Sequence, residues 1–436
     1  MALIDSTIII ADDLTGANDT ALQFFKRGAT TKIIIDYLED YSSKRHVDAW
    51  AISTESRNIS KEAAVQRVAG VVEKLKNDLG VEKFYKKIDS TLRGNTGLEI
   101  FAMLEATQSE IAIVAPAYIE EGRVTIGGYQ LLNGEVIERT QCALDPKAPI
   151  YESYIPDILK KDLNPQLHDL IGVIGLNVIT KGAGPIALKI NELVQSGKKV
   201  IVVDAMSNTD LEQIALAIKK SSFNILPCGS AGLADAINKI EGEENKEILE
   251  YDIPNLPRFI VSGSATQLTL KQIGILKESN KDIVFVDLEI KDIINGVSEE
   301  IISKISDNLA LNKDVVVHSS YINNEIMEEE SFNQLIDAGI AKTEIPSRIT
   351  DYLAELSSII NQKNKFILIM VGGETSFKCA TEMNTGYLKV LDAILPAVPL
   401  CVDKHGKFIV TKSGNFGKTT TLSEIIDYFN KANEEI

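Results

Sequence analysis

Two adjacent aspartates are the first residues in the chain whose type and placement point to chemistry. Asp12 and Asp13 follow the apolar run Thr7–Ile10 and belong to the segment Ala11–Asp19, ADDLTGAND. Neighbouring carboxylates at the end of a strand repel each other and lose hydration when buried, so such a pair persists mainly where it binds a cation, a hydroxyl or a metal. Asp12 and Asp13 are therefore candidate catalytic residues. The structural alternative is that Asp13, or Asn18, caps the helix that follows.

Cations and hydroxyls gather in three further segments of the amino-terminal half. Lys87, Asp89 and Arg93 lie in KKIDSTLRGN, Arg57 lies in TESRN, and Arg123 lies in GRVT just before a predicted hairpin. An arginine can hold a carboxylate through two parallel hydrogen bonds, although an exposed salt bridge is the commoner role of a single arginine. Several such segments in one half of the chain predict a polar pocket for a small hydroxylated anion.

Three segments of the carboxyl-terminal half share one design, in which an apolar strand ends in small residues and a helix begins. They are SGSAT at 262–266, GGETS at 372–376 and KSGNFGKT at 412–419. Glycine lets the chain turn with its N–H groups outward, and the N–H groups and dipole at a helix start favour an anion. The hydroxyls of Ser264 and Thr375 can add donors. A plain tight turn explains any one of these loops, but three together predict phosphate or nucleotide binding.

The last of these loops ends in Gly417-Lys418-Thr419, as a Walker A motif does. That motif requires a glycine five positions before Gly417, where this chain has Lys412. An ordinary P-loop ATPase is therefore disfavoured. It remains an alternative that predicts ATP hydrolysis without a second substrate and loss of activity on changing Lys418.

The elements that must position these residues follow an alternating α/β pattern. Strands are predicted at residues 7–10, 32–36, 49–53, 84–88, 111–115, 171–175, 200–204, 224–227, 258–261, 283–287, 314–318, 366–371 and 408–411. Helices are predicted at 19–27, 61–77, 96–107, 185–195 and 210–220, from about 267, and up to about 428. Strands separated by helices predict parallel sheets with crossover helices. Residues 129–137 instead predict a β-hairpin with an Asn133-Gly134 turn.

A domain boundary is predicted near residue 250. Residues 241–252 hold six carboxylates, and Pro254 and Pro257 follow, which is typical of a linker. The alternation of strands and helices then restarts. We predict two α/β domains, 1–250 and 256–436, each a mainly parallel sheet flanked by helices, with an active site in the cleft between them.

Composition disfavours several classes of function. The chain of 436 residues has 45 Lys and Arg against 62 Asp and Glu, a formal charge of −17, so nucleic-acid binding is not expected. The longest apolar runs, such as 366–371, are too short for a membrane span, and the amino terminus lacks the basic start of a signal peptide. Four separated cysteines and four histidines without metal-ligand spacing predict neither disulfides nor a zinc site, which fits a cytoplasmic protein.

Taken together, the motifs resemble those of one known family. ADDLTGAND, TESRN, KKIDSTLRGN, GRVTIGG, VSGSAT, GGETS and KSGNFG occur in the order found in the four-carbon acid sugar kinases, over essentially the whole chain. The resemblance implies an amino-terminal domain that holds a four-carbon sugar acid and a carboxyl-terminal domain that holds ATP. One departure is Ile119, where relatives usually carry proline. We expect an altered loop shape there and not a loss of activity.

The resemblance also implies roles for individual residues. Nucleotide contacts fall on seven residues of the three anion-binding loops: Ser264, Gly372, Gly373, Glu374, Thr375, Gly414 and Gly417. The acid-binding side falls on Asp12, Asp13, Arg57, Lys87, Asp89, Arg93 and Arg123.

The predicted reaction is transfer of a phosphoryl group from ATP to the terminal (4-) hydroxyl of the acid. Asp12 is the predicted base, with Asp13 or Asp89 as the fallback, and Arg93 or Arg57 fixes the substrate carboxylate. Such a transfer depends on in-line positioning of the two substrates and on neutralisation of phosphate charge.

Mg²⁺ on the β- and γ-phosphates is expected to supply much of that neutralisation, with Lys87 or Lys412 as helpers. No metal ligand is assigned. The KKIDSTLRGN version of the motif favours D-threonate or D-erythronate as the acceptor, and a 3-oxo-tetronate kinase remains an alternative. A non-catalytic, two-lobed sensor of a sugar acid or nucleotide is a second alternative. A homodimer is compatible with the sequence.

Overall fold

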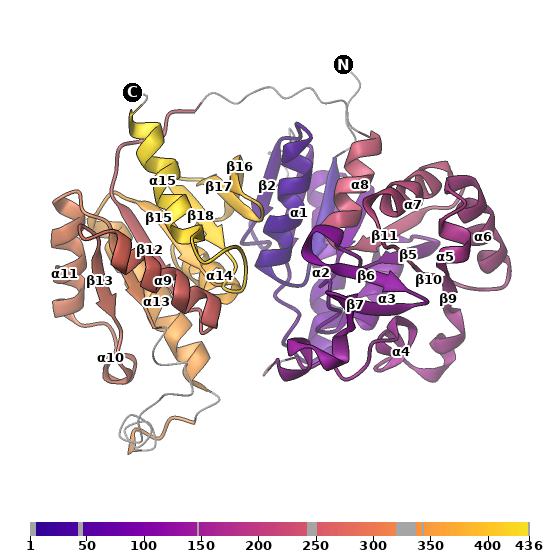
Figure 1. Ribbon diagram of the computed structural model, residues 1–436, viewed down its shortest axis with the longest axis horizontal. Helices are drawn as coiled ribbons and strands as arrows, with labels where there is room; N and C mark the ends of the chain where they lie inside the picture. Colours follow the sequence, from indigo (N-terminus) through magenta and orange to yellow (C-terminus); the bar gives the residue numbers. More distant parts are fainter. Residues whose placement is uncertain are drawn as a thin grey trace. The chain divides into compact units, whose positions relative to one another are not determined.

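The computed structural model describes residues 6–41, 47–145, 148–241, 251–319, 337–341 and 344–434. The chain divides into two compact units, Met1–Glu247 and Ile248–Ile436, and each has its own set of strands and helices (Figure 1). Most of the predicted linker, residues 242–250, lies outside the described residues.

The first unit is built on eight parallel strands in the order β2-β3-β1-β4-β11-β5-β10-β9. Their bounds are β1 Thr7–Ala11, β2 Thr31–Ile34, β3 Ala49–Ser53, β4 Lys83–Lys87, β5 Ile111–Ala115, β9 Ile171–Ile174, β10 Val200–Val203 and β11 Ile225–Gly229. Strands such as β5 (IAIVA) and β10 (VIVV) are apolar at every position, because helices cover both faces of the sheet. The predicted parallel α/β fold is confirmed.

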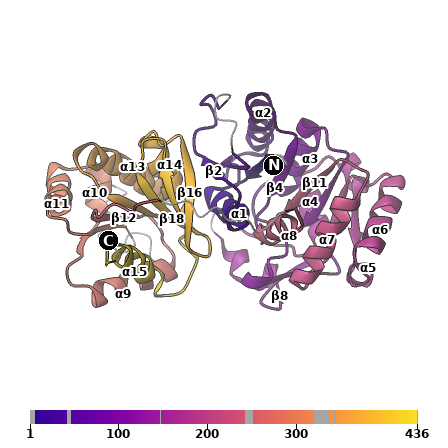
Figure 2. The same ribbon diagram turned by 90° about the horizontal axis from the view of Figure 1, so that it is seen from above.

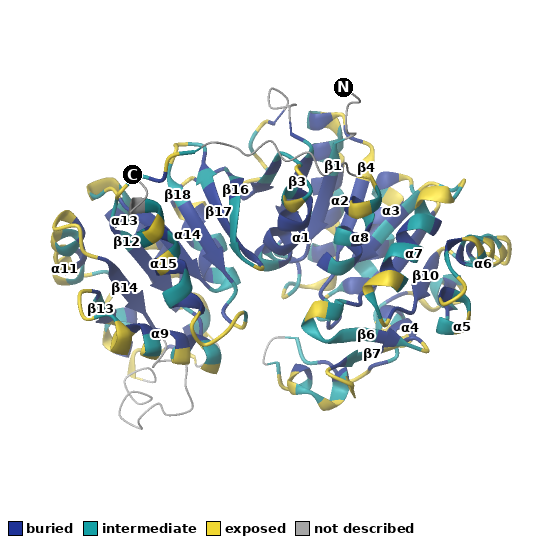
Figure 3. Ribbon diagram, turned by 45° about the horizontal axis from the view of Figure 1, so that its top comes forward, coloured by how far each residue is buried: buried dark blue, intermediate teal, exposed yellow. Residues whose placement is uncertain are grey.

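The helices of this unit form two layers. Their bounds are α1 Leu14–Lys26, α2 Lys61–Leu79, α3 Thr96–Thr107, α4 Ile155–Lys160, α5 Leu176–Ile179, α6 Ala183–Gln195, α7 Asn208–Lys220 and α8 Ala231–Glu241. Helices α2 and α3 pack together, while α8 contacts both α1 and α7 (Figure 2). The strands between the layers are buried, and the exposed residues lie mainly on helices and loops (Figure 3).

A small antiparallel sheet follows β5. It consists of β6 Arg123–Ile126, β7 Tyr129–Leu132 and β8 Glu135–Val136. The predicted hairpin turn is present, with a φ of 53° at Asn133 and 84° at Gly134. The hairpin prediction is wrong at Ile137, which begins a 3-10 helix, η2 Ile137–Arg139, and β6 is not predicted by the sequence pattern. Three more 3-10 helices are η1 Ile119–Glu121, η3 Gln141–Leu144 and η4 Pro165–Leu170.

The strands of the second unit run in the order β13-β14-β12-β15-β18-β17-β16. Their bounds are β12 Arg258–Ser262, β13 Val284–Asp287, β14 Val315–His318, β15 Ile367–Val371, β16 Tyr387–Leu395, β17 Val398–Asp403 and β18 Phe408–Lys412. The first five are parallel, as predicted, and β17 and β16 are antiparallel additions that the pattern misses. The sequence pattern of these two strands is weak, because Pro399 lies inside β17 and an irregularity in the pairing interrupts β16 near Asp392.

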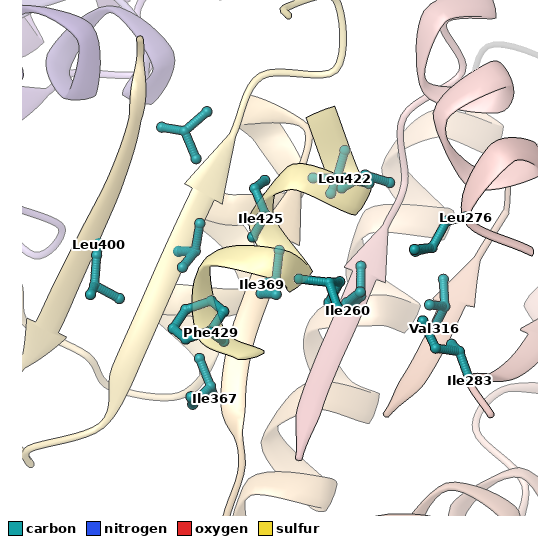
Figure 4. Close-up of a cluster of buried hydrophobic side chains, with 14 of the residues drawn as sticks. Ile260, Leu276, Ile283, Val316, Ile367, Ile369, Leu400, Leu422, Ile425 and Phe429 are labelled. Atoms are coloured by element: carbon teal, nitrogen blue, oxygen red, sulfur yellow. The ribbon is translucent and has the colours of Figure 1, made fainter. Parts of the chain in front are cut away.

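Helices also flank this second sheet on both faces. Their bounds are α9 Gln267–Ser279, α10 Ile290–Asn295, α11 Glu299–Ala310, α13 Ile345–Lys363, α14 Gly373–Glu382 and α15 Thr421–Glu434. Seen from above, α13 and α14 lie on one side of β12 and β18, and α9 and α15 lie on the other (Figure 2). Ile260 and Ile369 of the sheet pack with Leu276 of α9 and Phe429 of α15 in one buried cluster (Figure 4). Each such side chain contributes roughly 1.5–3 kcal/mol when fully buried.

Candidate active site

Three strand ends of the first unit meet where the strand order reverses. The chain reaches β3 on one side of β1 and then crosses to β4 on the other side. Because parallel strands end at the same edge, the segments after β1, β3 and β4 lie together, and open α/β sheets bind ligands at such a point. Asp12 follows β1, Arg57 follows β3 and Asp89 follows β4.

Carboxylates surround the guanidinium group of Arg57. Its Nε donates to Oδ2 of Asp12 at 2.7 Å, and its Nη2 donates to Oδ1 of Asp12 at 3.0 Å. Its Nη1 lies 2.6 Å from Oδ2 of Asp13, and its Nη2 lies 3.9 Å from Oδ1 of Asp89. The acidic pair that the sequence singles out therefore binds a cation supplied by the chain itself.

A second two-pronged ion pair lies beside the first. Arg93 donates from Nε to Oδ2 of Asp89 at 2.7 Å and from Nη2 to Oδ1 at 3.1 Å. Its Nη1 donates to Oδ2 of Asp145 at 3.0 Å. Both arginines that are predicted to hold a substrate carboxylate, Arg57 and Arg93, thus already have carboxylate partners.

The ion pairs keep Asp12 and Asp89 ionised. Burial raises the pKa of Asp12, but the charges of Arg57 and of the two lysines at the end of β4 lower it, and the pKa lies below its usual value. Burial also raises the pKa of Asp89, whereas Arg93 and Arg57 bring it well below the usual range. Both groups are therefore carboxylates at neutral pH, the form that can accept a hydrogen bond from a substrate hydroxyl.

Asp13 and Glu55 both hold the start of α1. Oδ1 of Asp13 accepts the N–H of Gly16 at 2.7 Å, which confirms the capping alternative and starts α1 at Leu14 rather than near residue 19. Oε1 of Glu55 accepts the N–H of Leu14 at 3.0 Å and the hydroxyl of Ser53 at 2.6 Å. The sequence analysis missed Glu55, although it lies within TESRN directly after a strand. Burial raises the pKa of Glu55 to about 7.

A cavity of about 310 Å³ lies beside these ion pairs. Its lining includes Arg57, residues 94–98 and Tyr151. Asn95 donates from Nδ2 to the carbonyl of Ser56 at 2.9 Å and so fastens together two of the loops that form the wall. The N-terminus of α3 in this wall has no side-chain cap, and its dipole favours an anion. The helix N-terminus beside this hollow fits a small carboxylate, whereas the charge of Arg57 is already matched by its own carboxylate partners.

The two lysines at the end of β4 have different surroundings. Lys86 is fully buried, and its Nζ lies 2.7 Å from Oε2 of the buried Glu99. Nζ of Lys87 donates to the carbonyl of Ile88 at 2.9 Å. A Cβ added at Gly16 would lie 3.0 Å from Nζ of Lys87, so this cation lies against the first turn of α1, close to the aspartates.

Arg123 has a different partner. Its Nη1 donates to the main-chain carbonyl of Glu121 at 2.6 Å and to Oε2 of the same residue at 2.8 Å. In the part of the chain that the structure describes, no ion pair joins it to Asp12, Asp13 or Asp89. Its role in substrate binding stays a prediction.

Two buried residues that the sequence analysis did not single out attach the small sheet to this region. Asp204, directly after β10, accepts the N–H groups of Gly127 at 2.7 Å and Gly128 at 2.8 Å. Gln130 donates from Nε2 to the carbonyl of Ser90, in the loop after β4, at 2.7 Å. Like Asp12, Asp204 directly follows an apolar strand. This sequence pattern could have identified it.

Asp19 provides a testable pH dependence of stability. Burial raises its pKa from 3.8 to about 6, and its Oδ1 accepts a hydrogen bond from the Tyr118 hydroxyl at 3.3 Å. As pH rises, the unfolded chain loses this proton first, so the free energy of unfolding falls between about pH 4 and about pH 6. We expect Asp19→Asn to remove that part of the slope and to stabilise the first unit at neutral pH by up to about 3 kcal/mol.

Urea unfolding of both proteins at about pH 4 and about pH 7 measures this effect. Trp50 is the single tryptophan of the chain and is buried in β3, so its fluorescence reports on the first unit. The pKa of Glu55 is also raised, to about 7. In Asp19→Asn the free energy of unfolding should therefore still fall with rising pH, but less than in the wild type. An unchanged slope in Asp19→Asn would contradict the assignment.

In the second unit, three loops lie side by side at the carboxyl edge of β12, β15 and β18, and the strand order reverses at β12. Gly372, with a φ of 109°, precedes α14 and offers no side-chain cap to its first turn, which includes Gly373 and Glu374. Thr375 in that turn is a buried residue, and its hydroxyl makes no hydrogen bond within the described residues. This helix start combines a favourable dipole with an available hydroxyl, as an anion site requires.

The loops after β12 and β18 are joined by hydroxyl groups. Thr266 and Thr269 both donate to the carbonyl of Gly414, at 2.8 Å and 2.7 Å, and Oγ of Ser264 lies 2.9 Å from Oγ1 of Thr269. A Cβ at Gly414 would overlap Oγ of Ser264, so this close approach requires glycine. The hydroxyl of Ser264 therefore supports the neighbouring loop, whereas that of Thr375 is available to a ligand.

The segment that resembles a Walker A motif forms the entry to α15. Gly417 has a φ of 88°, and the N–H of Lys418 donates to Oγ1 of Thr421 at 2.9 Å. Gln272 of α9 donates to the carbonyl of Lys418 at 2.6 Å. The main chain here is used to fasten the loop, and Lys418 itself is exposed.

No group of three or more His, Cys, Asp or Glu in the described residues is arranged to hold a metal ion. No helix in the described ranges combines the length and apolar character that a membrane crossing requires.

Two family models match the chain, in the order of its two units. Residues 7–237 match a sugar-binding N-terminal domain, and residues 259–422 match a nucleotide-binding C-terminal domain. With curated relatives that are kinases of four-carbon acid sugars, a sugar-binding domain followed by a nucleotide-binding domain makes this chain a phosphotransferase that acts on an alcohol group. The chain belongs to the four-carbon acid sugar kinase family, which confirms the resemblance of its motifs.

Curated relatives and solved structures match over almost the whole chain. A D-threonate kinase of Salmonella typhimurium is 29% identical over 432 residues, covering 97% of each chain. A D-erythronate kinase of Heliobacterium modesticaldum is 28% identical over 456 residues, covering 98% of this chain and 97% of the relative. The crystal structure of a Haemophilus influenzae protein has the same fold, with a TM-score of 0.74, 23% identity and coverage of 97% of this chain and 100% of that one.

Proposed function

We propose that this chain transfers the γ-phosphoryl group of ATP to the terminal hydroxyl of D-threonate or D-erythronate. One observation carries the proposal. An acid–arginine cluster stands at the point of strand reversal in the first unit, and three anion-binding loops stand at the corresponding point in the second. The names of the D-threonate and D-erythronate kinases among the relatives support the choice of acceptor.

The first unit supplies the acceptor side. The substrate carboxylate lies in the cavity beside Arg57 and the N-terminus of α3. Asp12 accepts the hydrogen bond of the terminal hydroxyl and takes its proton as the phosphoryl group is transferred. The two-pronged contact with Arg57 fixes the orientation of the Asp12 carboxylate. A fixed orientation supports the assignment of Asp12 as the general base.

The second unit supplies the donor side. The uncapped start of α14 and the hydroxyl of Thr375 bind phosphate oxygens, and Gly414 keeps the loop after β18 close to the loop after β12. Transfer requires that the terminal hydroxyl of the acid and the γ-phosphate of ATP meet in line with water excluded.

Mg²⁺ is proposed to enter with ATP. This ion usually keeps several waters and binds through substrate phosphates with one or two carboxylates, so it does not need a dedicated protein cage. No group of three or more His, Cys, Asp or Glu in the described residues is arranged to hold a metal ion, so no residue is assigned as its ligand. When bound, the ion neutralises charge on the phosphates.

A panel of acceptors tests the proposal. ADP release is measured with Mg·ATP and, separately, D-threonate, D-erythronate, the 3-oxo acid and no acceptor. We expect rapid release with one of the two epimers and little without acceptor. A hydrogen bond to one hydroxyl is enough to choose between epimers, by a factor as large as roughly 10⁴ when the unpaired group is buried.

The other outcomes of the panel identify the alternatives. Turnover with the 3-oxo acid alone would make the chain a 3-oxo-tetronate kinase. Saturable binding without turnover would favour the sensor, and release without acceptor that depends on Lys418 would favour an ATPase. A cytoplasmic location and a homodimer stay proposals, and light scattering of the purified protein measures the second.

A further inference from the structure

Lys412 is a buried cation whose charge has no counter-ion in the described structure. It is the last residue of β18, and its side chain is only 2% exposed. Its Nζ donates to the carbonyl of Ser413 at 2.7 Å, and no carboxylate of the described residues pairs with it. Burying a charge is costly unless it is paired, so this arrangement indicates a site that an anion completes.

The surroundings of Lys412 are those of the anion-binding loops. Its carbonyl accepts the N–H of Gly372 at 2.8 Å, so its main chain lies beside the uncapped start of α14, while its side chain belongs to the face of the sheet that α9 and α15 cover. In the parallel pairing, Ser262 is opposite Val371 and Val371 is opposite Lys412, so the three side chains form one row on one face of the sheet. The hydroxyl of Ser262 is also buried and has no hydrogen-bond partner among the residues that the structure describes.

The charge of Lys412 is sensitive to what binds there. Burial lowers its pKa to about 8, and no neighbouring charge opposes this effect. The elements packed against β18 carry the following titratable groups: Glu374, Lys378, Cys379 and Glu382 on α14, Cys401 and Asp403 on β17, Lys271, Lys277 and Glu278 on α9, and Glu424, Asp427, Tyr428 and Lys431 on α15. Strand β15 carries none. A phosphate beside Nζ would reverse the effect of burial, because an opposite charge favours the protonated form.

We propose that the ammonium group of Lys412 binds a phosphate oxygen of the nucleotide and is the buried counter-ion of the three loops. The assignment rests on the proposed function and adds to it a lysine contact that the glycine and hydroxyl residues of the loops do not supply. The proposal has a direct consequence. Above about pH 8, Lys412 is neutral in a fraction of the free protein molecules, so binding of the nucleotide takes up a proton.

Titration calorimetry of the whole chain measures this proton. Mg·ATP is titrated at about pH 8.5 in two buffers of different ionisation enthalpy, and the difference in heat gives the protons taken up. We expect roughly 0.7 proton per site for the wild type and close to none for Lys412→Met. We also expect Lys412→Met to bind Mg·ATP at least about tenfold more weakly while its affinity for adenosine, which has no phosphate, stays the same.

Lys407 is the matched control. It lies next to the start of the same strand, its pKa is also lowered to about 8, chiefly by burial, and its Nζ lies 3.5 Å from the centre of the Phe366 ring. Lys407→Met should therefore keep the full proton uptake and the wild-type affinity for Mg·ATP.

The outcomes separate this inference from the proposed function. A wild-type protein that does not bind Mg·ATP overturns the proposed function. Binding without proton uptake, or uptake that Lys407→Met removes, overturns the assignment of Lys412 and leaves the kinase proposal in place. If Lys412→Met does not fold, the wild-type uptake and the Lys407→Met control still decide the question.

Discussion

Asp12→Asn is expected to lower turnover by at least about 10²-fold while Mg·ATP binding is retained. Asparagine cannot take the proton of the acceptor hydroxyl, whereas the nucleotide loops belong to the other unit. The substitution also breaks a buried pair with Arg57, and such a loss costs about 3–5 kcal/mol when one partner stays unpaired. Here Asp13, at 2.6 Å from the guanidinium, still compensates the charge, so we expect a folded protein.

Asp89→Asn is the matched comparison for Asp12→Asn. Asp89 also has a two-pronged contact with an arginine and a pKa below its usual value, so its substitution likewise removes one partner of a buried ion pair. If Asp12 is the base, kcat falls further in Asp12→Asn than in Asp89→Asn, whose main effect is on KM for the acid. The reverse order would assign the base to Asp89, and near-normal turnover in Asp12→Asn would exclude Asp12.

Gly372→Ala is expected to weaken Mg·ATP binding by at least about tenfold. The φ of 109° at Gly372 lies in a region that other residues rarely adopt, at a cost of about 1–3 kcal/mol. A Cβ there would also lie 3.3 Å from Oγ1 of Thr375, the available hydroxyl donor of the same turn. Relief of this strain moves the N–H groups of the first turn of α14, so the loss is in nucleotide affinity and KM for the sugar acid changes little.

Gly406→Ala is the control that distinguishes a damaged nucleotide-binding loop from a general loss of stability. Gly406 has a φ of 82° in the turn before β18, and a Cβ there meets nothing within 4 Å. Both variants should unfold at lower urea concentration than the wild type, but only Gly372→Ala should bind Mg·ATP more weakly in calorimetry. Equal affinities in the two variants would remove the α14 start from the nucleotide site.

The elements of the fold could be predicted largely because their signals are local. β-branched runs such as the one in β10 are apolar at every position, and capping residues such as Ser60 mark helix starts within one turn. The pattern failed where tertiary contacts replace local preference. Strand β17 contains Pro399 and pairs as an antiparallel addition, and α1 begins early because the side chain of Asp13 turns back to Gly16.

The candidate site could be located but not resolved in detail. The motifs after β1, β3 and β4 identified the polar residues, since strand ends with carboxylates and arginines are unusual in a chain that otherwise alternates regularly. No pattern in the sequence showed that Arg57 would pair with Asp12 while Arg123 would pair with Glu121. Arg57 and Asp12 are 45 residues apart and come within hydrogen-bond distance only because β1 and β3 are neighbours, whereas Arg123 pairs locally with a residue two positions before it.

The amino-acid sequence alone determined the class of the fold, the two-part organisation and the family, because apolar periodicity, turn residues and motif order are all properties of neighbouring residues. The tertiary structure decided which charges are satisfied and which are not. Arg57 and Arg93 are held by carboxylates, whereas Lys412 is buried at a strand end with only a carbonyl partner. The physical reason is that the ionisation and availability of a side chain depend on burial and on charges brought close by folding, and neither is encoded by residue type or spacing.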